Sequence, residues 1–170
     1  MNLLKIPQGT PVIIDSNILL FANHKISLQC IKLLERCAGN EVLGVLPTNI
    51  LSEVMHLLLL AEIKDLGRIQ DTNIEKSLVE DPKNVMYLSR YESLMRDLLA
   101  GGLQIEPLQR EDFITALSFQ RQHGLLTNDA LFLAVALRLG IKDIVTSKTV
   151  FNAVPGIICY SPNDLNEELI

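Results

Sequence analysis

The chain has 170 residues, of which 48% are hydrophobic and 21% are charged. This length suits one domain, expected to span residues 1–170, and the composition excludes an intrinsically disordered chain. The net charge of −5 argues against indiscriminate nucleic-acid binding, because such binding depends on Lys and Arg side chains that neutralise phosphates. It does not exclude an enzyme that holds phosphates through a metal ion.

The N-terminus and the cysteines further limit the class of protein to which this chain can belong. The first residues lack the basic segment and apolar run of a secretory signal peptide. The longest apolar stretch, VMHLLLLAEI, is far shorter than the roughly 20 residues that cross a bilayer. Cys30, Cys37 and Cys159 include no CxxC pair, which argues against a disulfide framework or a zinc site. We therefore expect a cytoplasmic protein, without membrane association, whose thiols are reduced and packed.

The first half of the chain alternates strand and helix signals. An apolar, β-branched run follows Pro11 and ends at the carboxylate of Asp15, which predicts a buried strand followed by a loop. Ser27 suits a helix N-cap, and Gly39 suits the end of the same amphipathic helix. The predicted elements are a strand at 12–14, a helix at 27–39, a strand at 41–46, and a helix that Thr48 or Asn49 caps and that runs to about Leu66.

The second half continues the alternation. The segment 67–84 is the least periodic part, and is either a surface insertion or a short extra helix. The further predicted elements are a helix from Pro82 to the Gly101-Gly102 pair, a strand at 103–108, a helix from Glu111 to about His123, a helix capped by Thr127 or Asn128 and closed by Gly140, and strands at 143–147 and 156–162. This order predicts an α/β fold: a three-layer α/β/α sandwich with a central, mainly parallel sheet.

Three carboxylates lie next to apolar segments, where burial of a charge is unfavourable. Asp15 ends an apolar strand, at the edge where open parallel sheets place their ligands. Glu53 shares a helix side with apolar residues, and Asp129 opens an otherwise apolar helix. Each has an ordinary alternative: a strand-end turn, an exposed helix flank, or a first-turn acid that the helix dipole favours. Brought together, however, the three would repel one another unless a cation were present, and hard divalent cations prefer carboxylate oxygens.

These residues belong to a longer pattern. The segments VIIDSNILL, TNILSEVMHLL and LLTNDALFLAVALRLGIKDIVTS, followed by VPGI, resemble in order and spacing the PIN-domain family of metal-dependent ribonucleases, which includes VapC-type toxins. The resemblance implies that Asp15, Glu53 and Asp129 are catalytic and hold Mg²⁺ or Mn²⁺. In that family the ion orients and activates a water molecule that attacks an RNA phosphodiester.

The resemblance also assigns residues that would contact the substrate. Ser16 and Asn17 match the hydroxyl and amide that usually follow the first acid. Asn128 precedes the third acid and either caps its helix or contacts a phosphate. His24 and Lys25 are expected in a loop that borders the site, where they either contact phosphate or are simply solvated.

One position departs from the family pattern. After the last but one strand the family usually shows a further Asp, in a T-x-D-x-x-F arrangement, but this chain reads TSKTVF and has Lys148 there. Two outcomes are open, because a cation there repels a metal ion and attracts the acids. Lys148 either swings outward to contact a phosphate and leaves a working three-acid site, or it pairs with Asp15 or Asp129. With Lys148 paired to an acid, the domain would bind RNA or protein partners without cleaving RNA.

The sequence therefore leaves several functions in competition. The leading hypothesis is a Mg²⁺- or Mn²⁺-dependent endoribonuclease, toxin-like or RNA-processing; the alternative is a catalytically impaired PIN domain that binds RNA or protein. A nucleotide-binding, flavodoxin-like regulator is disfavoured, because no Gly-rich loop follows the first strand. The helix at 52–63 is apolar over most of its circumference, and the helix at 87–99 presents aromatic and Met residues at helical spacing. Both indicate either a thick core or an interface, with a second copy in a homodimer or with an antitoxin.

Overall fold

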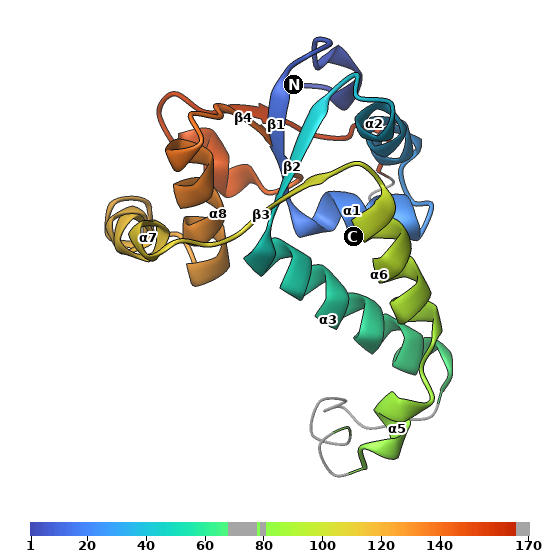
Figure 1. Cartoon of the computed structure of the whole chain (residues 1–170). Helices are drawn as coiled ribbons and strands as arrows, with labels where there is room; N and C mark the ends of the chain where they lie inside the picture. The colour runs from blue at the N-terminus through green and yellow to red at the C-terminus, as the bar shows by residue number, and fades with distance from the viewer. Residues whose placement is uncertain (68–77, 79–80, 166–170) are drawn as a thin grey trace.

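The computed structural model describes residues 1–67, 78 and 81–165. Within this part of the chain, five parallel strands form one sheet in the order β3-β2-β1-β4-β5 (Figure 1). The central strand β1 pairs Ile13 with Val45 of β2 on one side and with Ile144 of β4 on the other. The strands are β1 Pro11–Ile14, β2 Leu43–Pro47, β3 Gln104–Glu106, β4 Asp143–Val145 and β5 Ile158–Tyr160.

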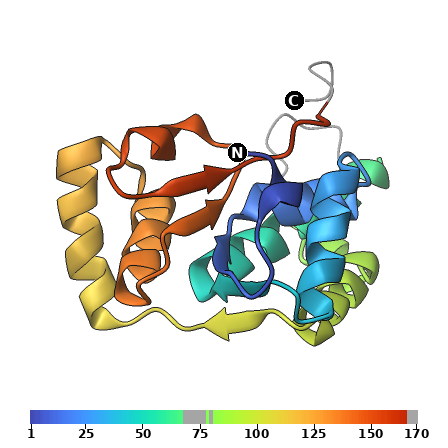
Figure 2. The same cartoon turned by 90° about the horizontal axis from the view of Figure 1, so that it is seen from above.

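Helices cover both faces of this sheet. Figure 2 shows α1, α2, α3 and α6 on one side of the strands and α7 with α8 on the other. This arrangement confirms the predicted α/β/α sandwich with a parallel sheet. The helices are α1 Ser16–Asn23, α2 Leu28–Ala38, α3 Thr48–Asp65, α5 Lys83–Met86, α6 Arg90–Ala100, α7 Arg110–His123 and α8 Thr127–Arg138, with short 3₁₀ helices η1 Leu3–Lys5 and η2 Thr149–Ala153.

The core explains why the strands and α8 are so apolar. Val12, Ile13 and Ile14 of β1 are fully buried, and α8 is buried without interruption from residue 130 to residue 136. A parallel sheet covered on both faces requires continuous apolar runs of this kind, because neither face meets water. No described helix combines the length and apolar composition that crossing a membrane requires.

Three helix starts depart from the sequence prediction, those of α1, α3 and α8. The predicted loop after β1 is instead the helix α1, whose N-cap is Asp15. Thr48 and Thr127 begin α3 and α8 but do not cap them, since the N-cap positions are Pro47 and Leu126. The threonine hydroxyls serve other elements: that of Thr48 accepts the N–H of Leu108 at 3.2 Å, and that of Thr127 accepts a bond from Gln120 at 3.3 Å. The alternative caps Asn49 and Asn128 lie one residue further inside these helices.

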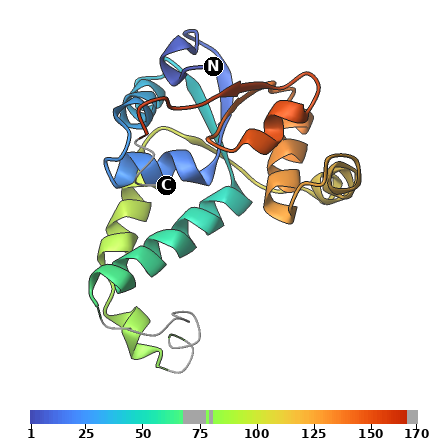
Figure 3. The same cartoon turned by 180° about the vertical axis from the view of Figure 1, so that it is seen from behind.

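The single helix predicted after Pro82 is two helices, α5 and α6. The carboxylate of Glu62, on α3, accepts the backbone N–H groups of Ser89, Arg90 and Tyr91 at 3.1, 3.1 and 2.8 Å. Free N–H groups mark the start of a helix, so this buried carboxylate starts α6 anew instead of letting α5 continue. α3 extends beyond the sheet and α5 lies near its far end (Figure 3). Most of the weakly periodic segment 67–84 lies outside the described residues.

Candidate active site

The first predicted acid, Asp15, is fully buried at the carboxyl end of β1. Its Oδ1 accepts the backbone N–H of Ser16 at 2.8 Å, and the Ser16 hydroxyl lies 3.3 Å from the same oxygen. Its Oδ2 accepts the hydroxyl of Thr146 at 2.7 Å and the side-chain amide of Asn17 at 3.4 Å. A buried carboxylate is costly without such hydrogen-bond donors, and these neighbours hold it in one orientation.

The second feature is Lys148, which follows β4 along the same edge of the sheet. Its Nζ lies 2.7 Å from Oδ1 of Asp129 and 3.3 Å from Oδ2 of Asp15, so one ammonium bridges two acids that are far apart in sequence. Partial burial by itself lowers the pKa of Lys148. The hydrogen bond to Asp129 and the charges of Asp15, Asp129 and Glu53 outweigh burial and raise it above its ordinary value. Lys148 is therefore a stable cation in this position.

Asp129 and Glu53 come to the site from two helices. Asp129 lies in the first turn of α8. Glu53 lies on α3, partly buried. Burial raises the pKa of Glu53, as do the charges of Asp15 and Asp129, while Lys148 and a hydrogen bond from Ser16 oppose the increase. The three acids thus interact electrostatically, as expected for side chains gathered at one edge of a parallel sheet.

Asn128 does not cap α8, which was one of its two predicted roles. It lies inside α8, one residue past the helix start, so it is not the N-cap. Its side-chain amide donates to Oε2 of Glu53 at 3.5 Å, and its backbone carbonyl accepts from the amide of Asn49 at 3.3 Å. Asn128 therefore links the beginning of α8 to α3 and orients Glu53. A contact with phosphate stays a prediction.

The donor chemistry suits a hard divalent cation, but a side chain stands in its place. Asp15 and Asp129 already converge on one positive charge, the Lys148 ammonium, which shows that both oxygens face a common point. Within the described residues, however, no group of three His, Cys, Asp or Glu side chains is arranged to hold a metal ion. Instead, the Lys148 ammonium occupies the point on which the oxygens of Asp15 and Asp129 converge.

His24 and Lys25 lie away from this cluster. They follow the C-terminal end of α1, whereas Asp15 caps its N-terminal end. Eight residues of helix separate the two ends, which corresponds to about 12 Å. His24 instead faces a small hollow shared with Asp65 and Arg90. The prediction that these two residues border the site is wrong, because α1 replaces the expected loop.

Two residues of the site were missed in the sequence. Thr146 bonds Asp15 and also accepts the backbone N–H of Lys148 at 3.0 Å. A signal existed, since a hydroxyl residue ends an apolar strand just before the divergent Lys148. The sequence predicts Asn49 only as a helix cap, yet its amide supports the start of α8. No local sequence feature indicates that contact, because its partner is 79 residues away.

Comparison with known proteins decides the family. Residues 12–157 match the family model of the PIN domain. The chain belongs to the PIN domain family. A comparison with curated protein sequences found no significant match.

Two solved structures resemble this PIN domain. One is VapBC2 from Rickettsia felis bound to a DNA fragment from its promoter, with 16% identity, a TM-score of 0.58, and coverage of 89% of this chain and 98% of the other. The second is a toxin-antitoxin complex from Klebsiella pneumoniae, with 17% identity, a TM-score of 0.55, and coverage of 86% and 95%. At such low identity these likenesses concern the fold.

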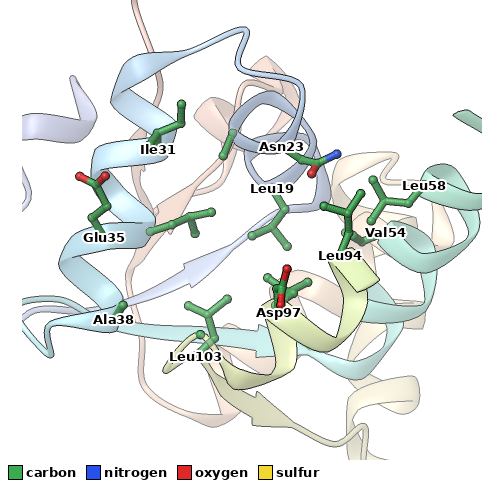
Figure 4. A pocket seen from close by; sticks show the side chains of 14 residues that line it. Leu19, Asn23, Ile31, Glu35, Ala38, Val54, Leu58, Leu94, Asp97 and Leu103 are labelled. Atoms are coloured by element: carbon green, nitrogen blue, oxygen red, sulfur yellow. The ribbon is translucent and has the colours of Figure 1, made fainter. Parts of the chain in front are cut away.

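The PIN domain also has an apolar hollow between its helices. Its lining includes none of the site acids Asp15, Glu53 and Asp129. The hollow has a volume of about 380 Å³ and lies between α1, α2, α3 and α6. Figure 4 shows Leu19, Leu94 and Leu103 directed into it, with the carboxylates of Glu35 and Asp97 also on its lining. The apolar residues that the sequence singled out on α3 and α6 therefore leave part of their surface uncovered, in addition to forming core.

Proposed function

We propose that this PIN domain is an endoribonuclease that requires Mg²⁺ or Mn²⁺. The observation that carries the proposal is the convergence of Asp15 and Asp129 on one positive charge, with Glu53 coupled to both. Residues of ordinary turns and helix flanks have no reason to gather in this way. The arrangement is expected of carboxylates that share a cation.

In this proposal Asp15, Glu53 and Asp129 would hold the ion. When bound, the ion would polarise a water molecule and the phosphate oxygens. The protein's own groups orient the acids: Ser16, Asn17 and Thr146 hold Asp15, and Asn128 holds Glu53. We also assign substrate contacts to the exposed amide of Asn128 and to Lys148 once it has left the acids.

Electrostatics supports a role for an added cation. By formal charge, the three carboxyl groups and the one lysine of the site sum to −2. Such a site repels an RNA phosphate unless further positive charge is added. A divalent ion would cancel those two charges and would free Lys148 to meet the phosphate.

The direct test is cleavage of RNA by the whole chain. We expect cleavage with Mg²⁺ or Mn²⁺ and none with EDTA, and faster cleavage by Lys148→Asp, which restores the carboxylate of the family pattern. The control is Lys142→Asp, which changes the same charge at the opposite end of β4, on an exposed residue. Metal-independent cleavage, or cleavage that survives loss of Asp15, would refute the proposal.

A second candidate is favoured by the ion pair itself. If Lys148 never leaves Asp129, from which it lies 2.7 Å away, the protein is an impaired PIN domain that acts by binding. The same assay separates the two candidates. A parent protein that cleaves no RNA at any Mn²⁺ concentration, beside an active Lys148→Asp variant, would establish the second candidate.

We further propose that the apolar hollow receives an antitoxin-like protein partner. One of the two similar solved structures is described as a toxin-antitoxin complex, and the other as VapBC2 bound to promoter DNA. The apolar lining with Glu35 and Asp97 suits an amphipathic segment that carries basic residues. The test is co-purification with the product of the adjacent gene, which Leu94→Asp should abolish. Leu137→Asp, on an exposed residue of α8, should leave it intact.

The remaining proposals concern assembly and location. We propose a homodimer in the cytoplasm. Light scattering of the purified chain, with and without its partner, measures the assembly directly. A monomer at all accessible concentrations would contradict the homodimer.

A further inference from the structure

The position of Lys148 is set by its backbone and not only by the attraction of the acids. Its N–H is bonded to the Thr146 hydroxyl at 3.0 Å, and η2 begins at the next residue. Phe151 of η2 is fully buried, and its ring lies 5.5 Å from that of Phe132 of α8. The main chain at Lys148 is therefore anchored, and the ammonium is held within reach of the acids at a high effective concentration.

The side chain itself is still able to leave. It is 32% exposed, whereas the carboxylate of Asp15 is 1% exposed and that of Asp129 is 14% exposed. Lysine has a flexible four-carbon stem, and this exposure puts the side chain at the edge of solvent. The acids, in contrast, are fixed by the ends of β1 and α8.

We propose that Lys148 is a built-in competitor of the metal ion. In the metal-free protein its ammonium bridges Asp15 and Asp129, and a divalent cation binds only in molecules where that ammonium has withdrawn. This inference rests on the proposed metal-dependent function and adds a regulatory contact to it. The apparent metal affinity is reduced by the fraction of molecules in the closed form, so the protein responds only at elevated metal concentration.

The first experiment measures Mn²⁺ affinity from the paramagnetic resonance signal of free Mn²⁺. We expect Lys148→Met to bind about tenfold more tightly than the parent, or better, since a partly buried ion pair no longer competes. Lys148→Arg keeps the positive charge and should resemble the parent. Lys142→Met, the matched control, removes an equal charge from an exposed residue at the other end of β4 and should change affinity by less than about twofold.

The second experiment follows the lysine itself and needs no variant. An amine-acylating reagent, with modification located by mass spectrometry, reports how accessible each ammonium is. Lys148 should react slowly in the metal-free protein and several times faster at saturating Mn²⁺, while exposed Lys142 should react at one rate throughout. This measurement tests whether Mn²⁺ displaces the Lys148 ammonium even if Lys148→Met does not fold.

The outcomes separate this inference from the proposed function. If no variant binds Mn²⁺, both the metal site and the competitor are refuted. If the parent and Lys148→Met bind Mn²⁺ equally, or if Mn²⁺ leaves the reactivity of Lys148 unchanged, the competitor is refuted while the metal site stands. Tighter binding by Lys148→Met, together with faster labelling of the parent in Mn²⁺, supports the competitor.

Discussion

The hydroxyl of Thr146 donates to Oδ2 of Asp15 across 2.7 Å, inside a part of the site where both residues are fully buried. This bond joins the ends of β1 and β4, which are neighbours in the sheet. It also couples the first carboxylate to Lys148, because the same hydroxyl oxygen accepts the N–H of Lys148. Thr146 is therefore a positioning residue between the acid and its cation.

Replacement of Thr146 by Val tests this role. Val keeps the shape but removes the shortest hydrogen bond to Oδ2 of Asp15, which should cost about 1–3 kcal/mol of unfolding free energy. Urea unfolding measures this loss. Mn²⁺ affinity should fall in the same variant, and Thr146→Ser should restore both properties. Equal loss in the Ser variant would show that packing, not the hydrogen bond, is what matters.

Removal of single carboxylates tests the proposed acids. Asp15→Asn, Glu53→Gln and Asp129→Asn should each reduce RNA cleavage by more than the roughly 10- to 100-fold expected for loss of an outer-shell partner. Circular dichroism checks that each variant is folded. Asp97→Asn serves as the control, since it removes an exposed acid beside the apolar hollow. A Glu53→Gln variant with parental activity would remove Glu53 from the site.

Glu62 should make stability depend on pH. Burial raises its pKa, but its hydrogen bonds from Tyr91, Arg90 and Ser89 prevail, so the pKa lies below its ordinary value of 4.5. A carboxylate with a lowered pKa in the folded state stabilises the fold above its unfolded pKa, and the contribution disappears as pH falls through the folded pKa.

Replacement of Glu62 by Gln reveals this contribution. The variant should be less stable than the parent by about 1–3 kcal/mol at pH 7, and the difference should shrink below about pH 4. Urea unfolding at several pH values supplies the measurement. Glu92→Gln, which alters an exposed acid paired with Arg96, should cost less than about 1 kcal/mol. A pH-independent difference for Glu62→Gln would contradict the assigned cause.

Arg138 connects α8 to β3 and α7. Its guanidinium lies 2.8 Å from Asp112 and 2.7 Å from Glu106, and Asp112 is almost completely buried. Arg138→Met should destabilise the protein by about 3–5 kcal/mol, because it leaves a buried charge without a partner. Thermal or urea unfolding measures the effect. Arg96→Met, at an exposed pair, is the comparison, and a similar small effect of both would refute the proposed role of Arg138.

Several local elements could be predicted because their signals are local. The apolar run of β1 forms a buried strand, and Ser27 caps α2, whose end is at Gly39. Alternation of strands and helices was sufficient for the parallel sheet, since crossover helices are the ordinary way to connect parallel strands. The order of acids along these elements also indicated one edge of the sheet, where β1 and α8 bring Asp15 and Asp129 together.

The sequence by itself determined the layers, the parallel sheet and the family pattern, because periodicity and caps depend on neighbours along the chain. Tertiary structure decided the rest. Glu62 separates α5 from α6 across 27 residues, and the Thr48 hydroxyl bonds Leu108 instead of capping its helix. Above all, the direction of the Lys148 ammonium depended on a carboxylate 133 residues earlier, so only the folded chain brings the two charges together.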